Sequence, residues 1–418
     1  MEGAHVPDNP RRPHLVWVNQ FARLPGDAGG SREFELSREL VRYGWRVTLA
    51  TSDLDFKKNQ YAHRSGPRDR RAIRKEIDGV EAVLLWASYY ERNDWRRALN
   101  WLTFYRSVAA LGRSLAPDVV IGSSPQLFAA AAGARLARAV GAPFVFEVRD
   151  LWPESLVAAG GREGPTYRLL ARVANSLYAK ADTIVVLAEG VREHLVQRGV
   201  PAAKIAYVPN GVDPNAFPAR GLESARTAVG PFTVIYAGAH GPANGLEVVL
   251  DAAHELRDDP RVRFVLVGGG PSKEGLREDA RRRSLGNVEF LDPVPKASIP
   301  ELLADADAGL MILRDAPLFS YGVSPNKLFD YLAAGLPVIN NVPGEVARWA
   351  QQSRCAIQTS DASGRALAAA VRELAERPGS EREVMGTRGR AWVREHHGRD
   401  VLAGRLHAAL APLVEAAS

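Results

Sequence analysis

The sequence predicts an α/β protein with two facing Rossmann-like domains, each built on a parallel sheet. Short apolar runs alternate with amphipathic stretches along the 418 residues, which is typical of parallel sheets covered by helices. The pattern restarts after Pro209-Asn210-Gly211-Val212-Asp213-Pro214, and the stretch that follows, to Gly230, has the composition of a linker. A chain of this length also suits more than one domain.

The first half contains six apolar runs that we expect to be strands. They are His14–Asn19, Arg46–Thr51, Val80–Trp86, Val119–Ile121, Pro143–Val148 and Thr183–Leu187. A glycine-rich turn at 26–30 follows the first run, and residues 31–43 have helical spacing with Phe34 and Leu40 on one face. A further helix is expected at 189–198. Right-handed crossovers between parallel strands then give a doubly wound sheet.

The second half repeats this organisation. Its expected strands are Phe232–Ala237, Arg263–Val267, Val288–Leu291, Ala308–Leu313 and Pro337–Asn340. A tail helix at Asp400–Ala416 has apolar residues at helical spacing and could pack on either domain or cross back to the first. The sequence therefore divides into a flexible tail (1–13), a first domain (14–215), a second domain (216–395) and a C-terminal helix (396–418).

Composition narrows the classes of partner. The formal net charge is +6, which favours phosphate groups or anionic lipid. No zinc-ligand spacing, RNA-binding motif or basic zipper occurs, so nucleic acid is the weakest candidate. The single cysteine, Cys355, fits a reducing compartment. Neither a signal peptide nor a membrane-spanning run is recognisable. We therefore expect a cytoplasmic protein that could bind the inner face of the membrane peripherally.

The loop at 236–245 is a candidate phosphate site. It follows a strand, precedes a helix, and contains Gly238, His240, Gly241 and Asn244. Glycines allow the backbone to approach a phosphate, and the N-terminus of a helix favours negative charge. The alternative is an ordinary tight turn. The dinucleotide fingerprint G-x-G-x-x-G is absent, which argues against a dinucleotide site.

The most specific segment is 324–337, Ser-Pro-Asn-Lys-Leu-Phe-Asp-Tyr-Leu-Ala-Ala-Gly-Leu-Pro. We expect a helix to begin here, with Pro325 in its first turn and Ser324 as its N-cap. Its N-terminus would direct backbone N–H groups into the cleft, and Lys327 would add a positive charge for a diphosphate. Asp330, one turn later, could accept ribose hydroxyl hydrogens. The alternative is an ordinary capped helix with one exposed ion pair.

A charged pair, Arg149-Asp150, directly follows an expected strand. The carboxyl ends of parallel strands are where such folds bind ligands. Arg149 could stabilise charge on a departing diphosphate, and Asp150 could orient an acceptor hydroxyl or take its proton. Glu154 could belong to the same cluster. The alternative is a structural ion pair that fixes the turn before Trp152-Pro153, and the residues alone leave both readings open.

Two Asp-x-Asp sequences imitate a metal site. Asp307 opens an expected strand, and Asp53 lacks a supporting cluster, so both are interpreted as solvated turn residues. We expect no catalytic metal and no cofactor, because cations and helix dipoles can stabilise a diphosphate. The stretch at 89–106 mixes aromatic with basic residues, among them Trp95 and Arg106. Such a helix suits a membrane interface, and the alternative is a Trp-rich core helix.

These segments resemble the family 4 retaining glycosyltransferases of GT-B fold, and the resemblance covers nearly the whole chain. Its elements are Gly29-Gly30 and the segments 209–213, 238–245 and 327–337. The segment Arg149-Asp150-Leu151-Trp152-Pro153-Glu154, with 324–327, is similar to one bacterial branch of O-antigen and capsule enzymes. That branch includes N-acetylfucosamine transferases acting on polyprenyl-diphosphate sugars.

The resemblance implies roles for individual residues. Lys327 would hold the donor diphosphate, and Asp330 would bind the ribose. Arg149 and Asp150 are the expected catalytic residues because of their position after a strand. The implied donor site comprises Gly238, His240, Gly241, Asn244, Val323, Ser324, Asn326, Lys327 and Asp330. The residues expected near the donor phosphate or the acceptor are Gly29, Gly30 and Glu154.

Three positions depart from the family pattern. The paired glutamates of the family, eight positions apart, would need a carboxylate where Gly322 stands. The Arg and Lys often found in the first loop of the second domain are replaced by Ala239 and Asn244, and a histidine common at the end of a first-domain strand is Arg149. The diphosphate charge would therefore rest more on Lys327, Arg149 and backbone dipoles.

The implied function is retaining transfer of a hexose or N-acetylhexosamine from a nucleotide diphosphate sugar, with UDP as the expected nucleotide. The acceptor would be a lipid-linked saccharide or another acceptor in surface polysaccharide biosynthesis. One alternative is a sugar-nucleotide 2-epimerase, which needs acid–base groups around the sugar. The other is a non-catalytic partner within a glycosyltransferase assembly.

Overall fold

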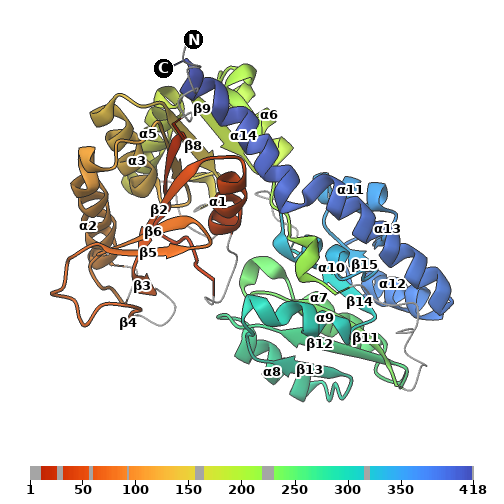
Figure 1. The fold of residues 1–418 in the computed structure, drawn as a ribbon. Helices are drawn as coiled ribbons and strands as arrows, with labels where there is room; N and C mark the ends of the chain where they lie inside the picture. Colours follow the sequence, from red (N-terminus) through yellow and green to blue (C-terminus); the bar gives the residue numbers. More distant parts are fainter. Residues whose placement is uncertain are drawn as a thin grey trace, which may run out of the picture.

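The structure is a computed structural model in which residues 11–25, 32–55, 60–91, 94–155, 164–218, 230–314 and 321–416 are described. Two sheets, each with helices on both faces, form two adjacent domains (Figure 1). This arrangement confirms the predicted α/β fold with two Rossmann-like domains.

The first sheet has the strand order β10-β9-β8-β7-β1-β2-β6-β5 among the described residues. Its strands are β1 (His14–Val18), β2 (Arg46–Ser52), β5 (Ile73–Ile77), β6 (Val80–Leu85), β7 (Val119–Ser123), β8 (Phe144–Val148), β9 (Thr183–Val186) and β10 (Ile205–Tyr207). Neighbours pair in parallel except β5 and β6, which are antiparallel. A separate antiparallel pair consists of β3 (Leu54–Asp55) and β4 (Gln60–Tyr61). The six predicted runs all form strands of the main sheet.

The second sheet is parallel throughout its described part, in the order β13-β12-β11-β14-β15-β16. Its strands are β11 (Phe232–Ala237), β12 (Val262–Val267), β13 (Val288–Leu291), β14 (Ala308–Met311), β15 (Val338–Asn340) and β16 (Ala356–Gln358). The strand order reverses between β11 and β14, and likewise between β1 and β7 in the first sheet. Loops diverge at such switch points and leave a crevice in which ligands bind.

Helices cover both faces of each sheet. On the first sheet, α2 (Trp95–Leu111), α3 (Leu127–Val140) and α5 (Pro165–Lys180) share one core, while α1 (Arg32–Arg42) packs on the opposite face. The remaining α-helices are α6 (Glu189–Gln197), α7 (Glu247–Glu255), α8 (Lys273–Arg282), α9 (Ile299–Ala304), α10 (Asn326–Ala333), α11 (Glu345–Ser353), α12 (Gly364–Glu376), α13 (Gly379–His397) and α14 (Arg399–Glu415). Short 3₁₀ helices are η1 (Gly112–Ser114), η2 (Ala202–Lys204), η3 (Pro214–Ala216), η5 (Pro242–Asn244) and η6 (Lys296–Ser298). Among the described residues, no helix is long and apolar enough to cross a membrane.

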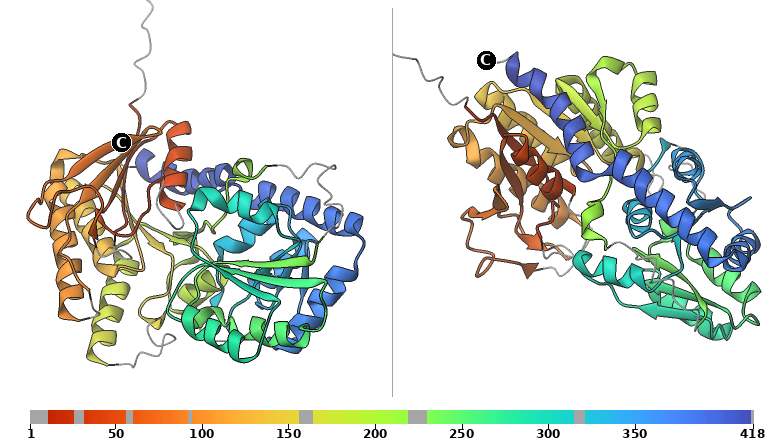
Figure 2. Two further views of the ribbon diagram at one scale, coloured as in Figure 1. Left: turned by 90° about the horizontal axis from the view of Figure 1, so that it is seen from below. Right: turned by 45° about the vertical axis from the view of Figure 1, so that its right-hand side comes forward.

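The tail crosses from the second domain back to the first. Helix α13 lies on the second domain, and α14 continues past Gly398 to pack against α1 (Figure 2). Leu402 and Leu406 enter the apolar core that contains Trp45 of the first domain. The backbone is tied at the crossing, because the Arg399 N–H donates to the Val212 carbonyl at 3.0 Å. The tail helix therefore crosses back to the first domain, as one of the predicted arrangements had it.

Three local expectations need correction. The edge strand β5 (Ile73–Ile77), with the sequence Ile-Arg-Lys-Glu-Ile, is not among the strands expected from the sequence. Asp53 is buried and pairs with Arg64 at 2.7 Å, so it is not a solvated turn residue. Asp307 accepts the Thr233 N–H at 2.8 Å and fixes a strand edge. Helix α2 buries Phe104 in the core, in line with the alternative of a core helix, while Trp95 at its start is 68% exposed.

Candidate functional site

A cavity of about 290 Å³ lies between the two domains, beside the carboxyl ends of strands from both sheets. The first domain contributes Arg149, Asp150 and Asn210 to its wall. Ala243, Val323 and Ser324 line the second-domain side. The structure thus brings together residues that the sequence placed in different domains.

Asn210 joins the two sides of this cavity. Its backbone N–H donates to Ser324 Oγ at 2.7 Å, and its side-chain amide donates to the Ser324 carbonyl at 2.7 Å. The buried Arg32 guanidinium lies below and donates to the Pro209 carbonyl at 2.5 Å and to Glu147 Oε1 at 3.1 Å. The loop before α10 is therefore anchored on a buried network of the first domain.

The expected cap of helix α10 is wrong in one respect. The helix begins at Asn326, Pro325 occupies the N-cap position, and no side chain caps it. Ser324 lies one residue earlier and accepts from Asn210 instead. The N–H groups of Val323, Ser324 and Asn326 donate to no group among the described residues. An anion at this end of the helix would find free donors and a favourable dipole.

Lys327 lies in the first turn of α10 and has an unusual environment for a lysine. Its amino group donates to the Tyr236 hydroxyl at 3.1 Å and to Asn244 Oδ1 at 3.2 Å, and it lies 4.6 Å from the centre of the Tyr236 ring. No carboxylate of the described residues contacts it. Burial therefore lowers the pKa of Lys327 to about 8. A bound diphosphate would supply the missing negative charge.

The glycine loop that begins at Gly238 is packed tightly against the rest of the second domain. A Cβ atom at Gly268 would lie 1.8 Å from the Gly238 carbonyl, so only glycine allows the two loops to touch. His240 is fully buried and neither ring nitrogen has a hydrogen-bond partner among the described residues. Burial, with a smaller effect of Lys273, lowers its pKa to about 4, so the ring is neutral. Gly241 precedes the turn that brings Asn244 onto Lys327.

Asp330 faces a lysine that sequence reasoning missed. Lys296 Nζ lies 2.5 Å from one carboxylate oxygen of Asp330 and 2.6 Å from the other. An ionised carboxylate has about four acceptor positions, so this bidentate contact leaves capacity for ribose hydroxyls. The lysine also fixes the orientation of the carboxylate. Its position, on η6 and 34 residues away, gives no local signal in the sequence.

Arg149 pairs with Glu33 rather than with its neighbour Asp150. Glu33 is buried and also accepts from the Asn19 side-chain amide at 2.7 Å, so the carboxylate is firmly held. Burial opposes the charge of Arg149, but Glu33 and Glu147 outweigh it and keep the pKa of Arg149 above its ordinary value. Asp150 is exposed toward the cavity. The surrounding protein partly removes its carboxyl from water, which raises the pKa of Asp150, and the positive charge of Arg149 opposes this shift.

Position 322 has a carboxylate beside it although the residue is glycine. A Cβ atom at Gly322 would lie 3.3 Å from Glu345 Oε2 and 3.1 Å from the Ala188 Cβ. Glu345 accepts from the Tyr207 hydroxyl at 2.6 Å and from the Glu189 N–H at 3.1 Å, and burial raises its pKa. Gly322 also has φ of +84°, which favours glycine. A side chain at 322 would compete with this contact between the domains.

Of the expected site residues that the structure describes, the cavity wall includes Arg149, Asp150, Val323 and Ser324 but not Gly238, His240, Gly241, Asn244, Asn326, Lys327, Asp330 or Glu154. Glu154 turns toward Arg198, at 2.7 Å, and does not line the cavity wall. Gly29 and Gly30 lie outside the described residues. The residues not assigned to the site from the sequence are Asn210, Tyr236, Glu33 and Lys296. Of these, Asn210 had the clearest signal, because it belongs to the segment 209–213 singled out in the sequence and lies just past the carboxyl end of β10.

Curated relatives resemble parts of the chain. A putative colanic acid biosynthesis glycosyl transferase, WcaI of Escherichia coli K12, is 27% identical over 52% of this chain and 56% of its own length. A GDP-mannose-dependent α-(1-6)-phosphatidylinositol monomannoside mannosyltransferase of Mycobacterium tuberculosis is 29% identical over 54% of this chain and 60% of its own length. The chain thus spans little more than half the length of these relatives.

Solved structures match over nearly the whole chain. Sucrose-phosphate synthase of Thermosynechococcus elongatus has a TM-score of 0.75 at 18% identity, covering 97% of this chain and 100% of its own. Anabaena HepE in complex with UDP-glucose has a TM-score of 0.69 at 16% identity, covering 96% and 99%. At this identity the likeness shows the fold, which is GT-B.

Family comparison covers both halves. Residues 29–211 match the family described as "Glycosyl transferase 4-like domain", and residues 231–377 match the one described as "Glycosyl transferases group 1". The two matches lie on either side of the predicted linker and together span most of the chain. The chain therefore belongs to the group 1 and 4-like glycosyltransferases of GT-B fold.

Proposed function

We propose that this protein transfers a hexose or N-acetylhexosamine from a nucleotide diphosphate sugar, with retention of configuration. The observation that carries the proposal is the environment of Lys327. Lys327 lies in the first turn of a helix beside a cavity between two domains, and within the described part of the chain neither its amino group has a carboxylate partner nor the leading N–H groups an acceptor. A diphosphate matches this arrangement in charge and in hydrogen-bond acceptors.

In the proposed donor complex, Lys327 and the N–H groups of Val323, Ser324 and Asn326 hold the diphosphate. Asp330, oriented by Lys296, accepts the ribose hydroxyls. The loop with Gly238, His240, Gly241 and Asn244 forms the wall next to the phosphates. We propose that no metal or cofactor is needed, because the chain supplies the positive charge itself.

The proposed chemistry takes place at the first-domain side of the cavity. The bond between the anomeric carbon and the diphosphate oxygen breaks, and its electron pair leaves with the diphosphate. The acceptor oxygen attacks from the same face and its proton passes to the departing phosphate. Arg149, held by Glu33, stabilises the charge on the diphosphate, and Asp150 orients the acceptor hydroxyl. Closure of the domains would exclude water.

UDP is the nucleotide we propose, and a lipid-linked saccharide of a surface polysaccharide is the acceptor. HepE was solved with UDP-glucose, whereas the mycobacterial relative uses GDP-mannose, so the two bases must be compared directly. The E. coli relative is named for colanic acid biosynthesis, which supports a polysaccharide role. A lipid-linked acceptor would bring the exposed Trp95 of α2 close to a membrane surface.

The test is a thermal-shift screen with UDP-, GDP-, dTDP- and ADP-sugars in the presence of EDTA. A ligand that binds the folded state raises the melting temperature by mass action. We expect a shift with UDP-sugars that disappears in Lys327→Met and persists in Lys75→Met, which removes a lysine of the edge strand β5. A shift with another base alone would correct the nucleotide, and no shift with any donor would favour a non-catalytic partner.

A further inference from the structure

Helix α6 of the first domain is capped by a residue of the second domain. Its N-cap is Ala188, whose methyl group cannot accept a hydrogen bond, and alanine is a poor residue at this position. The Glu189 N–H, one of the donors that a helix start leaves without an internal partner, donates to Glu345 Oε2 at 3.1 Å. Glu345 is the first residue of α11 in the second domain. The end of α6 is therefore completed only when the two domains are in contact.

Both carboxylate oxygens of Glu345 bind the first domain. While Oε2 accepts the Glu189 N–H, Oε1 accepts from the hydroxyl of Tyr207, the last residue of β10, at 2.6 Å. Glu345 is only 5% exposed, so little water reaches the carboxylate to replace these donors. The two hydrogen bonds exist only in this arrangement of the domains, and they therefore favour it over a more open one.

The same end of α6 supports the loop before α10. A Cβ atom at Gly190 would lie 2.4 Å from the Tyr321 carbonyl oxygen, so a side chain there would force the helix and the loop apart. The Tyr321 ring packs on His194, one turn further along α6, with the ring centres 4.6 Å apart. The loop that brings Val323 and Ser324 to the cavity thus rests on the helix end that Glu345 caps.

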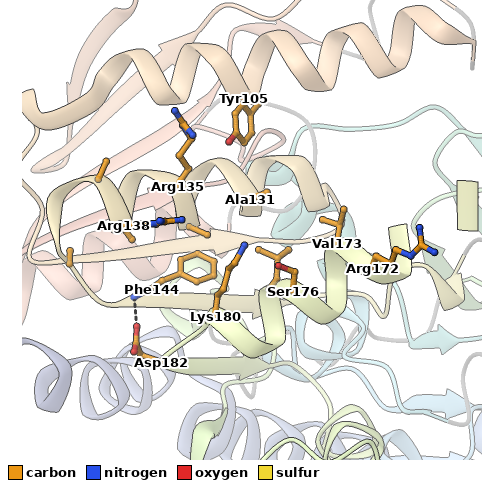
Figure 3. Close-up of a pocket in the computed structure, with 15 residues that line it drawn as sticks. Tyr105, Ala131, Arg135, Arg138, Phe144, Arg172, Val173, Ser176, Lys180 and Asp182 are labelled. Carbon is orange, nitrogen blue, oxygen red and sulfur yellow. Dashed lines mark hydrogen bonds between the residues drawn. The ribbon is translucent and has the colours of Figure 1, made fainter. Parts of the chain in front are cut away.

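A second cavity, of about 1020 Å³ between α3 and α5, has no part in this contact (Figure 3). It shares no lining residue with the cavity between the domains. Arg172, labelled in Figure 3, belongs to its lining and is exposed on α5. This part of the first domain therefore offers a control position away from the contact between the domains.

We propose that Glu345 is a positioning residue for donor binding. By capping α6 across the domain boundary, it holds the two domains in the arrangement in which the loop at 321–324 reaches the cavity. The proposal rests on the proposed function only for the identity of the ligand, because the arrangement of the domains can be measured without a donor. Removal of the carboxylate leaves the Glu189 N–H and the Tyr207 hydroxyl without their acceptor and weakens the closed arrangement.

Pulsed electron paramagnetic resonance on the full-length protein measures this arrangement directly. Spin labels on Glu193→Cys of α6 and Gln352→Cys of α11, both exposed positions, report the separation of the two helices. The native Cys355 is buried and does not take a label. We expect one narrow distance distribution with Glu345 present, and a broader distribution with longer distances after Glu345→Ala.

Two controls and one milder variant accompany this measurement. Glu274→Ala removes an exposed acid from the first turn of α8, in the second domain, and Arg172→Ala removes an exposed charge from the first domain. Neither should change the distances. Tyr207→Phe removes one of the two hydrogen bonds to Glu345 and should broaden the distribution less than Glu345→Ala. The same distribution with and without the Glu345 carboxylate would overturn the proposal.

A rescue variant separates positioning from stability. Ala188→Ser gives α6 a cap of its own, because the backbone at 188 is extended and a serine hydroxyl there can accept from the first N–H groups. Added to Glu345→Ala, it should recover much of the lost melting temperature. The distances should stay broad, and UDP affinity should stay about five- to tenfold below wild type, a usual size for coupling between two parts of a protein.

The outcomes of the rescue are distinct. Recovery of UDP affinity together with the melting temperature would assign Glu345 a purely structural role and overturn the proposal. Failure of the wild type to bind UDP would instead refute the proposed nucleotide. In that case the distance distributions alone would decide whether Glu345 holds the domains together.

Discussion

Asn210 and Ser324 form a two-point contact between the domains, through the Asn210 N–H to Ser324 Oγ and the Asn210 amide to the Ser324 carbonyl, both at 2.7 Å. Ser324 directly precedes the N-cap of α10, and Lys327 follows in the first turn. The first domain thereby positions the end of the helix that we propose to hold the donor diphosphate.

Asn210→Ala removes the amide and leaves the Ser324 carbonyl without its partner. We expect the free energy of unfolding to fall by about 1–2 kcal/mol, since a lost buried hydrogen bond costs this much. UDP affinity should fall several-fold because the loop before α10 is less firmly held. Calorimetric titration and urea unfolding measure both, with Asn215→Ala, at an exposed position, as control. A stability loss with unchanged affinity would mean that the contact joins the domains without positioning the site.

Gly322→Ala should be destabilising for two separable reasons. Its φ of +84° disfavours a side chain, and its Cβ would contact Ala188 at 3.1 Å. Gly199 has φ of +88° and no atom within 4 Å of its Cβ position, so Gly199→Ala measures the backbone cost alone. We expect Gly322→Ala to cost roughly 1 kcal/mol more than Gly199→Ala in urea unfolding. Equal costs would show that position 322 has room for a side chain.

Arg149→Ala should reduce kcat by about 10²–10³, the usual loss when a group that stabilises developing charge is removed. The KM for the donor should change little, because Lys327 and the helix N-terminus hold the ground state. Glu33→Gln should have a smaller effect in the same direction, since Glu33 only holds Arg149 in place. Arg198→Ala, which breaks the ion pair with Glu154, is the control. Unchanged kcat with a lower melting temperature would assign Arg149 a structural role.

Lys327→Met should make the protein more stable near neutral pH while abolishing UDP binding. Burial lowers the pKa of Lys327 from 10.5 to about 8, so the charged form is disfavoured in the folded state. That penalty is fully present below pH 8 and disappears as the pH rises through about 10.5, when the lysine is neutral in both states. The stability advantage of the variant should therefore shrink between these pH values in urea unfolding. An advantage that grows with pH would contradict this sign.

Buried strands were predictable because their signal is local. Central strands such as β11, with the sequence Phe-Thr-Val-Ile-Tyr-Ala, are enclosed on both faces and read as apolar runs. The edge strand β5, Ile-Arg-Lys-Glu-Ile, alternates on a half-exposed surface, and its charges concealed it within a basic run. Burial thus made the central strands predictable, whereas three edge strands, β5, β10 and β16, were missed.

The contacts within the site were less predictable than the strands. The sequence predicted a helix beginning near Lys327, and the structure has one. It could not predict that Ser324 Oγ would accept a hydrogen bond from the Asn210 N–H instead of capping the helix, or that Lys296 would pair with Asp330, because both partners come from distant segments. The low pKa of Lys327 depends on its burial, which only the assembled fold can show.

Proton uptake on UDP binding tests the central claim most directly. At pH 9 a lysine with a pKa of about 8 is mostly neutral, and a bound diphosphate should raise that pKa and draw in a proton. Calorimetry in two buffers of different ionisation enthalpy measures the number of protons. We predict uptake approaching about one proton per UDP for wild type and Lys75→Met, with tight binding lost in Lys327→Met. UDP binding without proton uptake, or binding and uptake unchanged in Lys327→Met, would contradict the assignment of Lys327 to the diphosphate.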